Sequence, residues 1–304
     1  MLVRFAIDEL YTEKKFENVT ENTMVSYKAV LEPFHAFLEE KGIENIEYVT
    51  KRHIKEYLLH RQEKGNNATT VNNHHKYVNA FFRWLTEEKI VHENPVTGIK
   101  KQKEDIQIHV FTDEEVQQII SYFRRMNRRE KTFYSIRDYN LFLTLISTGL
   151  RLSEAINLRW TDVNYDNGSL VVSKPKSRKQ ETVPLTERLM KELSLYQKHC
   201  EKKFHTSMDY IFVTSRNKPL TRNAVKCIFK RVASAMNFPN TRVSAHTCRH
   251  YYAKKFIENG GDISQLQKML RHTNIATTQK YLHFFGNEVA EANEKYNALN
   301  NLDI

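Results

Sequence analysis

Two histidines and an arginine are grouped in the stretch AHTCRHYYAKKF, residues 245–256. His246 and His250 have the spacing of a helical metal-binding pair, but Thr247 stands where a zinc protease of the HExxH kind has glutamate. No carboxylate cluster or cysteine pair in the sequence supplies further ligands. Arg249 adds N–H donors, which do not help to hold a cation. Three interpretations remain: a metal site, a packed core with incidental polar groups, or a clamp for a phosphate, which the donor chemistry favours.

A second arginine lies in TGLRLSEAINL, residues 148–158. Apolar residues precede and follow Arg151, so we expect this arginine where the chain turns between two buried segments. Glu154, three residues further on, is within reach of Arg151 if the segment is helical. The two residues form either a structural ion pair or a carboxylate that holds a guanidinium toward an anion.

A basic hairpin is predicted between two short strands, Leu170–Val172 and Thr182–Leu185. A run of charges in a turn is usually only solvated. Alternatively, a lysine at the tip of a flexible hairpin enters a DNA groove and donates a proton to an oxygen. The cations of this hairpin are Lys174, Lys176, Arg178 and Lys179.

The segment QLQKMLRHTNIATTQKYLHFFG, residues 265–286, predicts an amphipathic helix that ends at His272 and a new helix that begins near Asn274. Tyr281 follows nine residues after His272. A lone tyrosine in a helix is generally a core or surface residue. A functional interpretation of Tyr281 therefore depends on the residues that accompany it.

Taken in order, R-x-x-E, a basic hairpin lysine, H-x-x-R, L-x-H and a tyrosine resemble the tyrosine recombinases, also called the phage integrase family. TGLRLSEAINLRWTDV resembles the first-arginine box of this family. AHTCRHYYAKKFIENGGDISQLQKMLRHTNIATTQKYLH resembles its second box, through to the nucleophile. The helical first hundred residues resemble its core-binding domain, so the resemblance covers nearly the whole chain. One box alone is weakly specific, whereas the ordered set at these spacings is strongly specific.

The resemblance implies a set of donors around a scissile phosphodiester. Arg151 and Arg249 would hold its non-bridging oxygens. His246 and His272 would complete the donor set and assist proton transfer, and Glu154 would hold Arg151 in place. Fixed donors of this kind stabilise the pentavalent state more than the ground state. The resemblance implies no metal or other cofactor, because arginines supply the charge that Mg²⁺ supplies elsewhere.

The resemblance also implies the reacting groups. Tyr281 would attack phosphorus and form a 3′-phosphotyrosyl link. Lys176 would be the general acid that protonates the departing 5′ oxygen; counting back from the second strand selects it, although Lys174 and Lys179 are close. The chain departs from the family's L-G-H pattern, because Arg271 stands in place of the glycine. Arg271 either adds a phosphate contact or perturbs the turn that positions His272.

The first hundred residues predict several helices that would position this chemistry. Apolar residues recur at helical spacing over Met24–Leu38, although Pro33 should kink or break this helix. Thr50 is expected to cap a second helix, and Thr69 or Thr70 a third. The polar face of the third helix is either solvated surface or a face laid against a nucleic-acid backbone. This face carries Asn72, Asn73, His75, Lys76, Asn79 and Arg83.

The expected fold is mainly α, with a mixed α/β catalytic domain that contains a small three-stranded antiparallel sheet. We expect a helical core DNA-binding domain over residues 1–98, a polar linker over 99–110, and the catalytic domain over 111–304. A short C-terminal helix is expected at 287–300. The resemblance implies that it packs into a neighbouring subunit; alternatively, it folds onto its own domain. Helix starts within the catalytic domain are predicted after Thr112 (with Glu115, a capping box), Thr221, Ser244 and Asp262.

The net charge of +11 favours a polyanionic partner. No apolar run approaches the ~20 residues that a membrane span needs. Three cysteines without a CxxC pair fit a reducing compartment, so we expect a cytoplasmic protein. The resemblance implies that it is bacterial or phage-encoded. The resemblance implies double-stranded DNA as the partner, a homotetramer on that DNA, and an accessory DNA-bending or directionality protein.

Three other functions stay open at this point. The chain could be a DNA-binding regulator that kept the recombinase fold without recombination, and Arg271 is the best support for it. It could be a type IB topoisomerase, which uses the same chemistry, or a metal hydrolase. A covalent adduct lost in Tyr281→Phe, a requirement for a specific site, and activity in EDTA would separate these from a recombinase.

Overall fold

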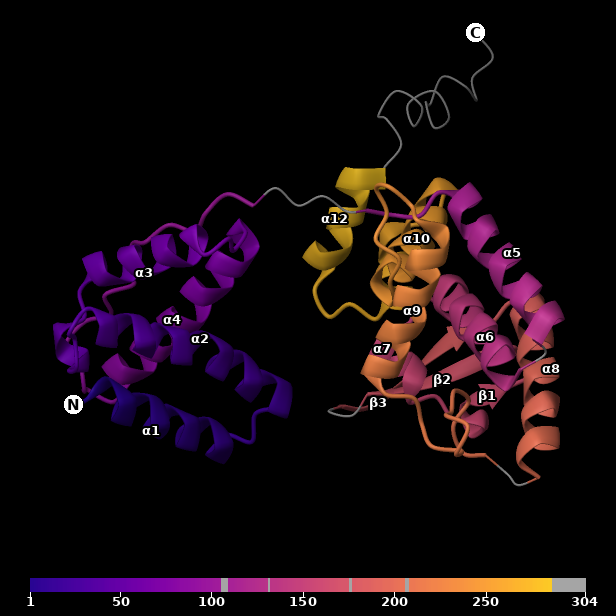
Figure 1. The fold of residues 1–304 in the computed structure, drawn as a ribbon, viewed down its shortest axis with the longest axis horizontal. Helices are drawn as coiled ribbons and strands as arrows, with labels where there is room; N and C mark the ends of the chain where they lie inside the picture. The colour runs from indigo at the N-terminus through magenta and orange to yellow at the C-terminus, as the bar shows by residue number, and fades with distance from the viewer. Residues whose placement is uncertain (105–108, 131, 175–176, 206–207, 286–304) are drawn as a thin grey trace, which may run out of the picture. The chain divides into compact units, whose positions relative to one another are not determined.

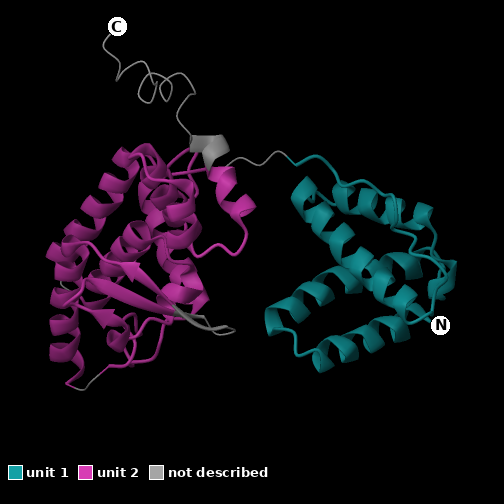
Figure 2. Cartoon of the chain, turned by 180° about the vertical axis from the view of Figure 1, so that it is seen from behind, with its two compact units in different colours: residues 1–107 teal, residues 108–304 magenta. Residues whose placement is uncertain are grey.

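The computed structural model describes residues 1–104, 109–130, 132–174, 177–205 and 208–285, with side chains outside 173–180 and 282–285 (Figure 1). The chain divides into two compact units, residues 1–107 and 108–304 (Figure 2). Most of the described residues are helical, and three antiparallel strands form one small sheet. The expected fold class is confirmed.

The first unit is built from helices around one aromatic-rich core. The rings of Phe34 and Tyr57 meet edge to face at 4.9 Å, and Phe82 lies 6.1 Å from Phe34. Such edge-to-face pairs stabilise a core beyond the area that they bury. The helices are α1 (Val3–Phe16), α2 (Glu21–Glu40), α3 (Lys51–Glu63) and α4 (Ala68–Glu87), with a 3₁₀ turn at Ile46–Tyr48.

Two sequence expectations for this unit are corrected. Helix α2 continues through Pro33, because Leu31 and Phe34 on either side are fully buried and their packing offsets the lost hydrogen bond. Helix α4 begins earlier than expected: the Asn67 side chain, and not Thr69 or Thr70, caps it by accepting from the backbone N–H of Thr70 at 2.9 Å.

In its described residues, the second unit combines the sheet with eight helices. Strand β2 (Ser169–Lys174) is central, between β1 (Val163–Asn164) and β3 (Ser177–Pro184), and the β2–β3 register shifts at Ser173/Lys174. Its helices are α5 (Asp113–Glu130), α6 (Phe133–Thr148), α7 (Leu152–Ile156), α8 (Glu187–Phe204), α9 (Arg222–Met236), α10 (Ala245–Glu258), α11 (Ile263–Leu270) and α12 (Ile275–Phe285), and a 3₁₀ turn covers Trp160–Asp162.

Predicted caps begin several of these helices. Thr221, Ser244 and Asp262 each accept from a backbone N–H in the first turn of α9, α10 and α11. Thr112 and Glu115 exchange backbone and side-chain hydrogen bonds of 3.0 and 3.2 Å, which is the predicted capping box of α5. The N-termini of these helices could be predicted from the sequence because each capping hydrogen bond joins residues only a few positions apart.

Helix α6 is the centre of the second unit, since it packs against α5, α8 and α10 and most of its side chains are buried. A smaller apolar cluster joins α10, α11 and α12, which lie together in Figure 1. This cluster includes Leu266, Leu270 and the ring of Tyr281. The packing therefore brings the C-terminal end of α6, the start of α7 and the helices α10–α12 to one place.

Candidate active site

Gly149 ends α6 in the left-handed region, with φ of 60°. A side chain at this position would also collide, because a Cβ would lie 2.6 Å from the ring of Tyr252. The turn after Gly149 delivers Arg151 to the start of α7, where its side chain is 40% exposed. The sequence expectation that Arg151 lies at a turn between buried segments is met, and the turn aims its guanidinium out of the core.

Glu154 holds Arg151 from two directions. Its carboxylate accepts from the Arg151 backbone N–H at 2.8 Å and from Arg151 Nη1 at 2.9 Å. Arg151 Nη2 donates to the backbone oxygen of Arg271 at 3.2 Å. A guanidinium fixed at this many points loses little freedom on meeting an anion, so the remaining donors are pre-organised.

Arg249 is buried, with 3% of its surface exposed, and projects from α10 toward the end of α6. Its Nη1 donates to the Gly149 oxygen at 2.6 Å, and its Nη2 donates to the Leu270 oxygen. Nη2 also lies 2.8 Å from Nε2 of His272. Burial, followed by the charge of Arg151, lowers the pKa of Arg249 to about 10, so it remains a cation at neutral pH.

The contacts of His272 fix its tautomer. Arg249 can only donate, so Nε2 of His272 accepts, and Nδ1 therefore carries the proton that it donates to Thr278 Oγ1 at 2.8 Å. Burial and the charges of Arg249 and Arg151 lower the pKa of His272 to about 4. His272 is thus neutral at pH 7. Thr278 was not singled out in the sequence, where a threonine in TTQKY gives no signal of its own.

Tyr281 lies in the same place, buried at 4% exposure. Its hydroxyl is 2.9 Å from Nδ1 of His250, and its ring is parallel to that of His272 at 6.5 Å. Burial raises the pKa of the Tyr281 phenol, while Arg249 and Arg151 oppose this rise. The hydroxyl therefore carries its proton and donates to His250, which the sequence analysis considered only as half of a metal-binding pair.

His246 reaches this group through a ring contact. Its imidazole meets that of His250 edge to face, with centroids 4.1 Å apart. Burial and the charges of Arg249 and Arg242 lower the pKa of His246. We call Arg151, Arg249, His250, His272 and Tyr281 the Arg–His–Tyr cluster; His246 borders it.

The side chain of Arg271, expected either to contact a phosphate or to perturb the turn before His272, is paired inside the protein. This side chain is 1% exposed and faces inward, where Nη2 donates to Glu154 at 2.8 Å and Nη1 to the Met269 oxygen at 2.7 Å. The backbone explains the usual glycine of L-G-H, because Arg271 ends α11 with φ of 55°, in the left-handed region. The turn that delivers His272 is formed nonetheless, with the His272 N–H bonded to the Gln267 oxygen.

The basic hairpin is described only in part. Lys176, the predicted general acid, lies outside the described residues. The backbone of Lys174 belongs to β2 and those of Arg178 and Lys179 to β3, while their side chains lie outside the description.

The polar face predicted on α4 also needs correction. Asn72 and His75 are buried and hold the chain that follows the helix. Asn72 exchanges hydrogen bonds of 2.8 Å with the backbone of Gln102, and His75 Nε2 lies 3.0 Å from the Ile99 oxygen. Asn79 is half-buried, whereas Asn73, Lys76 and Arg83 remain exposed.

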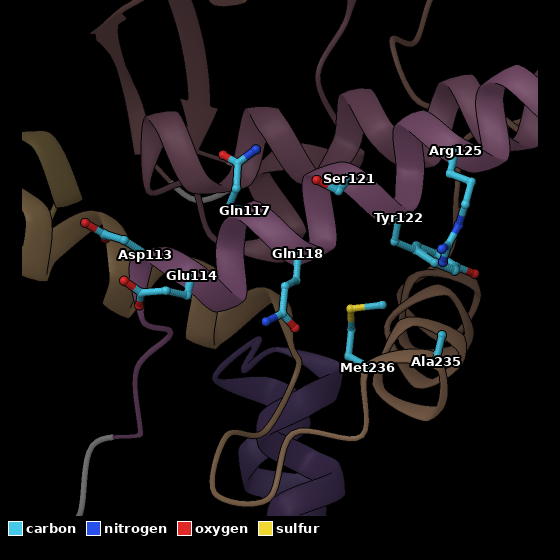
Figure 3. Close-up of a pocket in the computed structure, with 9 residues that line it drawn as sticks. All are labelled: Asp113, Glu114, Gln117, Gln118, Ser121, Tyr122, Arg125, Ala235 and Met236. Carbon is cyan, nitrogen blue, oxygen red and sulfur yellow. The ribbon is translucent and has the colours of Figure 1, made fainter.

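A pocket between α5 and α9 contains none of the predicted site residues (Figure 3). Its rim carries Asp113, whose carboxylate accepts from Lys255 Nζ at 2.9 Å and from the Tyr251 hydroxyl at 3.0 Å. An acidic rim does not suit a phosphate. Within the described ranges, no three His, Cys, Asp or Glu side chains gather as metal ligands, and no helix is long and apolar enough to cross a membrane.

Two family models match this chain. The model of the phage integrase family matches residues 109–288, and that of the phage integrase N-terminal SAM-like domain matches residues 10–89. The chain belongs to the phage integrase family. This tyrosine recombinase is 30% identical over 287 residues to the tyrosine recombinase of Pseudothermotoga lettingae, with 93% of each protein covered. It is 26% identical to the tyrosine recombinase XerD of Staphylococcus haemolyticus, over 88% of this chain and 89% of that protein.

Solved structures share the fold of this recombinase. A fragment of the Tn1549 transposon integrase in complex with a circular intermediate DNA matches with a TM-score of 0.80 at 19% identity, over 98% of this chain and 99% of that chain. A lambda integrase dimer bound to a core site matches with a TM-score of 0.73 at 18% identity, over 91% and 97%. The resemblance read from the ordered motifs is confirmed, and the chain is an enzyme of the site-specific recombinase class.

Proposed function

We propose that this recombinase cuts and rejoins duplex DNA through a 3′-phosphotyrosyl intermediate. The observation that carries the proposal is the convergence of Arg151, Arg249, His272 and Tyr281, which are separated by up to 130 residues. Arg249 contacts His272, the rings of His272 and Tyr281 are parallel, and Arg151 donates to the backbone oxygen of Arg271, directly before His272. Integrases of the same fold were solved in complex with circular intermediate DNA and with core-site DNA. The net charge of +11 suits such a partner.

In this reaction the Tyr281 oxygen attacks phosphorus, and the bond to the 5′ oxygen breaks. Arg151 and Arg249 stabilise the charge on the non-bridging oxygens, and removal of one such donor typically costs ~10²–10³ in rate. His246 and His272 complete the donor set, which for His272 requires a proton on Nε2, because this nitrogen accepts from Arg249 in the protein without DNA. Lys176 protonates the leaving oxygen. The covalent link retains the energy of the cut bond, so rejoining requires no ATP.

We assign DNA binding to both parts of the chain. Residues 1–98 form the core-binding domain and 111–304 the catalytic domain, joined by the linker 99–110. The exposed cations Lys76 and Arg83 on α4, together with the hairpin cations, contact the phosphate backbone. We further propose that a tetramer carries out recombination in the cytoplasm, with an accessory DNA-bending or directionality protein. The segment 287–300, expected to join neighbouring copies, lies outside the described residues.

The test needs the target site first. Tyr281→Phe protein, which binds without cutting, selects sequences from a pool of random duplexes. The wild-type protein is then given selected duplexes that carry a nick beside the scissile phosphate, so that the cut product is trapped. We expect a covalent protein–DNA adduct that survives denaturation and is absent with Tyr281→Phe. Binding without any adduct would instead indicate a DNA-binding regulator. Adducts on every duplex, whatever its sequence, would indicate a topoisomerase.

A further inference from the structure

Three imidazoles lie in or beside the Arg–His–Tyr cluster, and they differ in what their nitrogens contact. Both nitrogens of His272 are engaged, Nε2 by Arg249 and Nδ1 by Thr278. His246 contacts the cluster by ring packing on His250. His250 is the imidazole with a nitrogen at hydrogen-bond distance, 2.9 Å, from the Tyr281 hydroxyl. A nitrogen at hydrogen-bond distance from the attacking oxygen is suitably placed to take the proton of that oxygen.

The protonation states give this contact a direction. Burial, the neighbouring His246 and the charge of Arg249 lower the pKa of His250 to about 4, so its imidazole is neutral at pH 7. The buried phenol of Tyr281 keeps its proton. The hydroxyl therefore donates and Nδ1 accepts, which is the arrangement that precedes a proton transfer from tyrosine to histidine.

We infer that His250 is a catalytic residue, the general base that accepts the phenolic proton of Tyr281 as its oxygen attacks phosphorus. The inference rests on the proposed function. The Tyr281 O–H bond breaks, the proton moves to His250 Nδ1, and the new P–O bond forms. The P–O5′ bond breaks, and the leaving oxygen takes its proton from the general acid. In rejoining, the 5′ hydroxyl attacks phosphorus and returns its proton to the deprotonated general acid. The P–O bond to Tyr281 breaks, and the His250 imidazolium gives its proton to the departing phenolate.

Bound DNA makes His250 a better base than it is in the free protein. A phosphodiester held by Arg151 and Arg249 places a negative charge beside the cluster and offsets the charge of Arg249. An opposite charge nearby favours the protonated imidazole and raises its pKa. The site is therefore idle without DNA, with Tyr281 protonated, and becomes competent when the phosphate arrives.

A different interpretation of the same contact is that His250 only holds Tyr281 at rest. The two interpretations predict opposite effects. If His250 only holds Tyr281 in the resting protein, it slows the attack, so its removal leaves the rate unchanged or increases it. A base accelerates the attack, so its removal lowers the rate. His250→Asn separates the two, because its amide oxygen can accept a hydrogen bond in place of Nδ1 but cannot take the proton.

The experiment measures the single-turnover rate of covalent adduct formation on a nicked duplex, with either oxygen or sulfur as the 5′ bridging atom. A sulfur leaving group needs no proton, so it relieves defects of the general acid and not of the base. We expect His250→Asn and His250→Ala to lower the rate by ~10²-fold on both substrates. An unchanged or faster rate, or recovery on the sulfur substrate, would overturn the inference.

Controls keep the outcome interpretable. His205→Asn serves as the matched control and should leave the rate unchanged, because His205 ends α8 with φ of 54°, which asparagine tolerates well. Melting temperature and DNA affinity confirm that each variant is folded, and His250→Gln replaces His250→Asn if the latter melts early. Failure of the proposed function appears differently, as a wild-type protein that forms no adduct at all.

Discussion

Arg271 Nη2 donates to Glu154 at 2.8 Å across 117 residues of sequence, from a backbone position that favours glycine. The same carboxylate accepts from Arg151 Nη1 at 2.9 Å. Burial raises the pKa of Glu154, but the charge of Arg271 and the hydrogen bonds from Arg151 and Arg271 lower it more, so the pKa lies below its ordinary value. One ionised carboxylate thus connects the turn before His272 with the arginine proposed to bind the phosphate.

The steric cost of the left-handed backbone at Arg271 can be measured separately from the contribution of its ion pair with Glu154. Arg271→Ala and Arg271→Gly both delete the contact with Glu154, but only alanine keeps a Cβ at φ of 55°. We expect the glycine variant to be more stable than the alanine variant by about 1 kcal/mol, because glycine populates this region without steric cost. Urea unfolding of the two proteins gives the difference. Equal stabilities would mean that the Cβ is not strained there.

Loss of the carboxylate should cost more than loss of Arg271. Glu154→Gln leaves the buried guanidinium of Arg271 without its counter-charge and frees Arg151 from its fixed position. We expect a destabilisation of about 3 kcal/mol and a slower adduct formation than in Arg271→Gly. Denaturant titration and the single-turnover assay measure the two effects. A Glu154→Gln protein as active and stable as Arg271→Gly would contradict the shared role.

Arg249 should not be replaceable by lysine. Its planar fork donates at once to Gly149, Leu270 and His272, which a single ammonium cannot do. We expect Arg249→Lys to lower the rate of adduct formation by ~10²–10³ while DNA binding is largely kept. Arg216→Lys, at an exposed position, is the matched control and should react normally. A normal rate in Arg249→Lys would show that charge alone suffices.

Acid should destabilise the protein through histidines that are buried or half-buried in the folded state. Burial and the charge of Arg61 lower the pKa of His74 to about 4, and Nδ1 of His74 lies 2.7 Å from the Tyr57 hydroxyl. The pKa in the unfolded chain is near 6.5, so between about pH 6.5 and 4 the unfolded state binds more protons. The free energy of unfolding therefore falls as the pH falls through this window. His250 and His272 contribute in the same direction.

Urea unfolding at several pH values between 7 and 4 measures this effect. The Tyr57 hydroxyl donates to the Val30 oxygen, so His74 Nδ1 donates to Tyr57. His74→Asn keeps a donor of similar reach and does not titrate, so its stability should depend less on pH than that of the wild type. An equal pH dependence in both proteins would exclude His74 as a contributor.

Salt dependence distinguishes the exposed from the buried side chains of α4. Lys76→Gln and Arg83→Gln should weaken DNA binding and each reduce the log–log salt slope by about 0.9, because each removes one phosphate contact. Asn72→Ala should leave the slope unchanged and lower stability, since Asn72 holds Gln102 and Glu104. Filter binding over a range of salt gives the slopes. If Lys76→Gln and Arg83→Gln both leave the salt slope unchanged, α4 does not contact the DNA backbone.

The sequence could predict features that depend on near neighbours. The caps Ser244 and Asp262, the strands on either side of the basic hairpin, and the turn at Gly149 all follow from residues a few positions apart. The order of motifs also identified the family, because each motif is local and its residue types are specific. Local signals of this kind need no knowledge of which helix packs against which.

The burial of two polar residues that the sequence did not reveal has one physical cause. Arg271 and Asn72 are polar residues at positions that look exposed, yet each is buried by a partner distant in sequence, Glu154 and Gln102. Periodicity alone cannot show that a polar side chain has found such a partner. The packing of α6, α10, α11 and α12 also decided which histidine meets Tyr281. Sequence determined the fold class and the reacting residue types, whereas tertiary contact alone placed His250 on the hydroxyl of Tyr281.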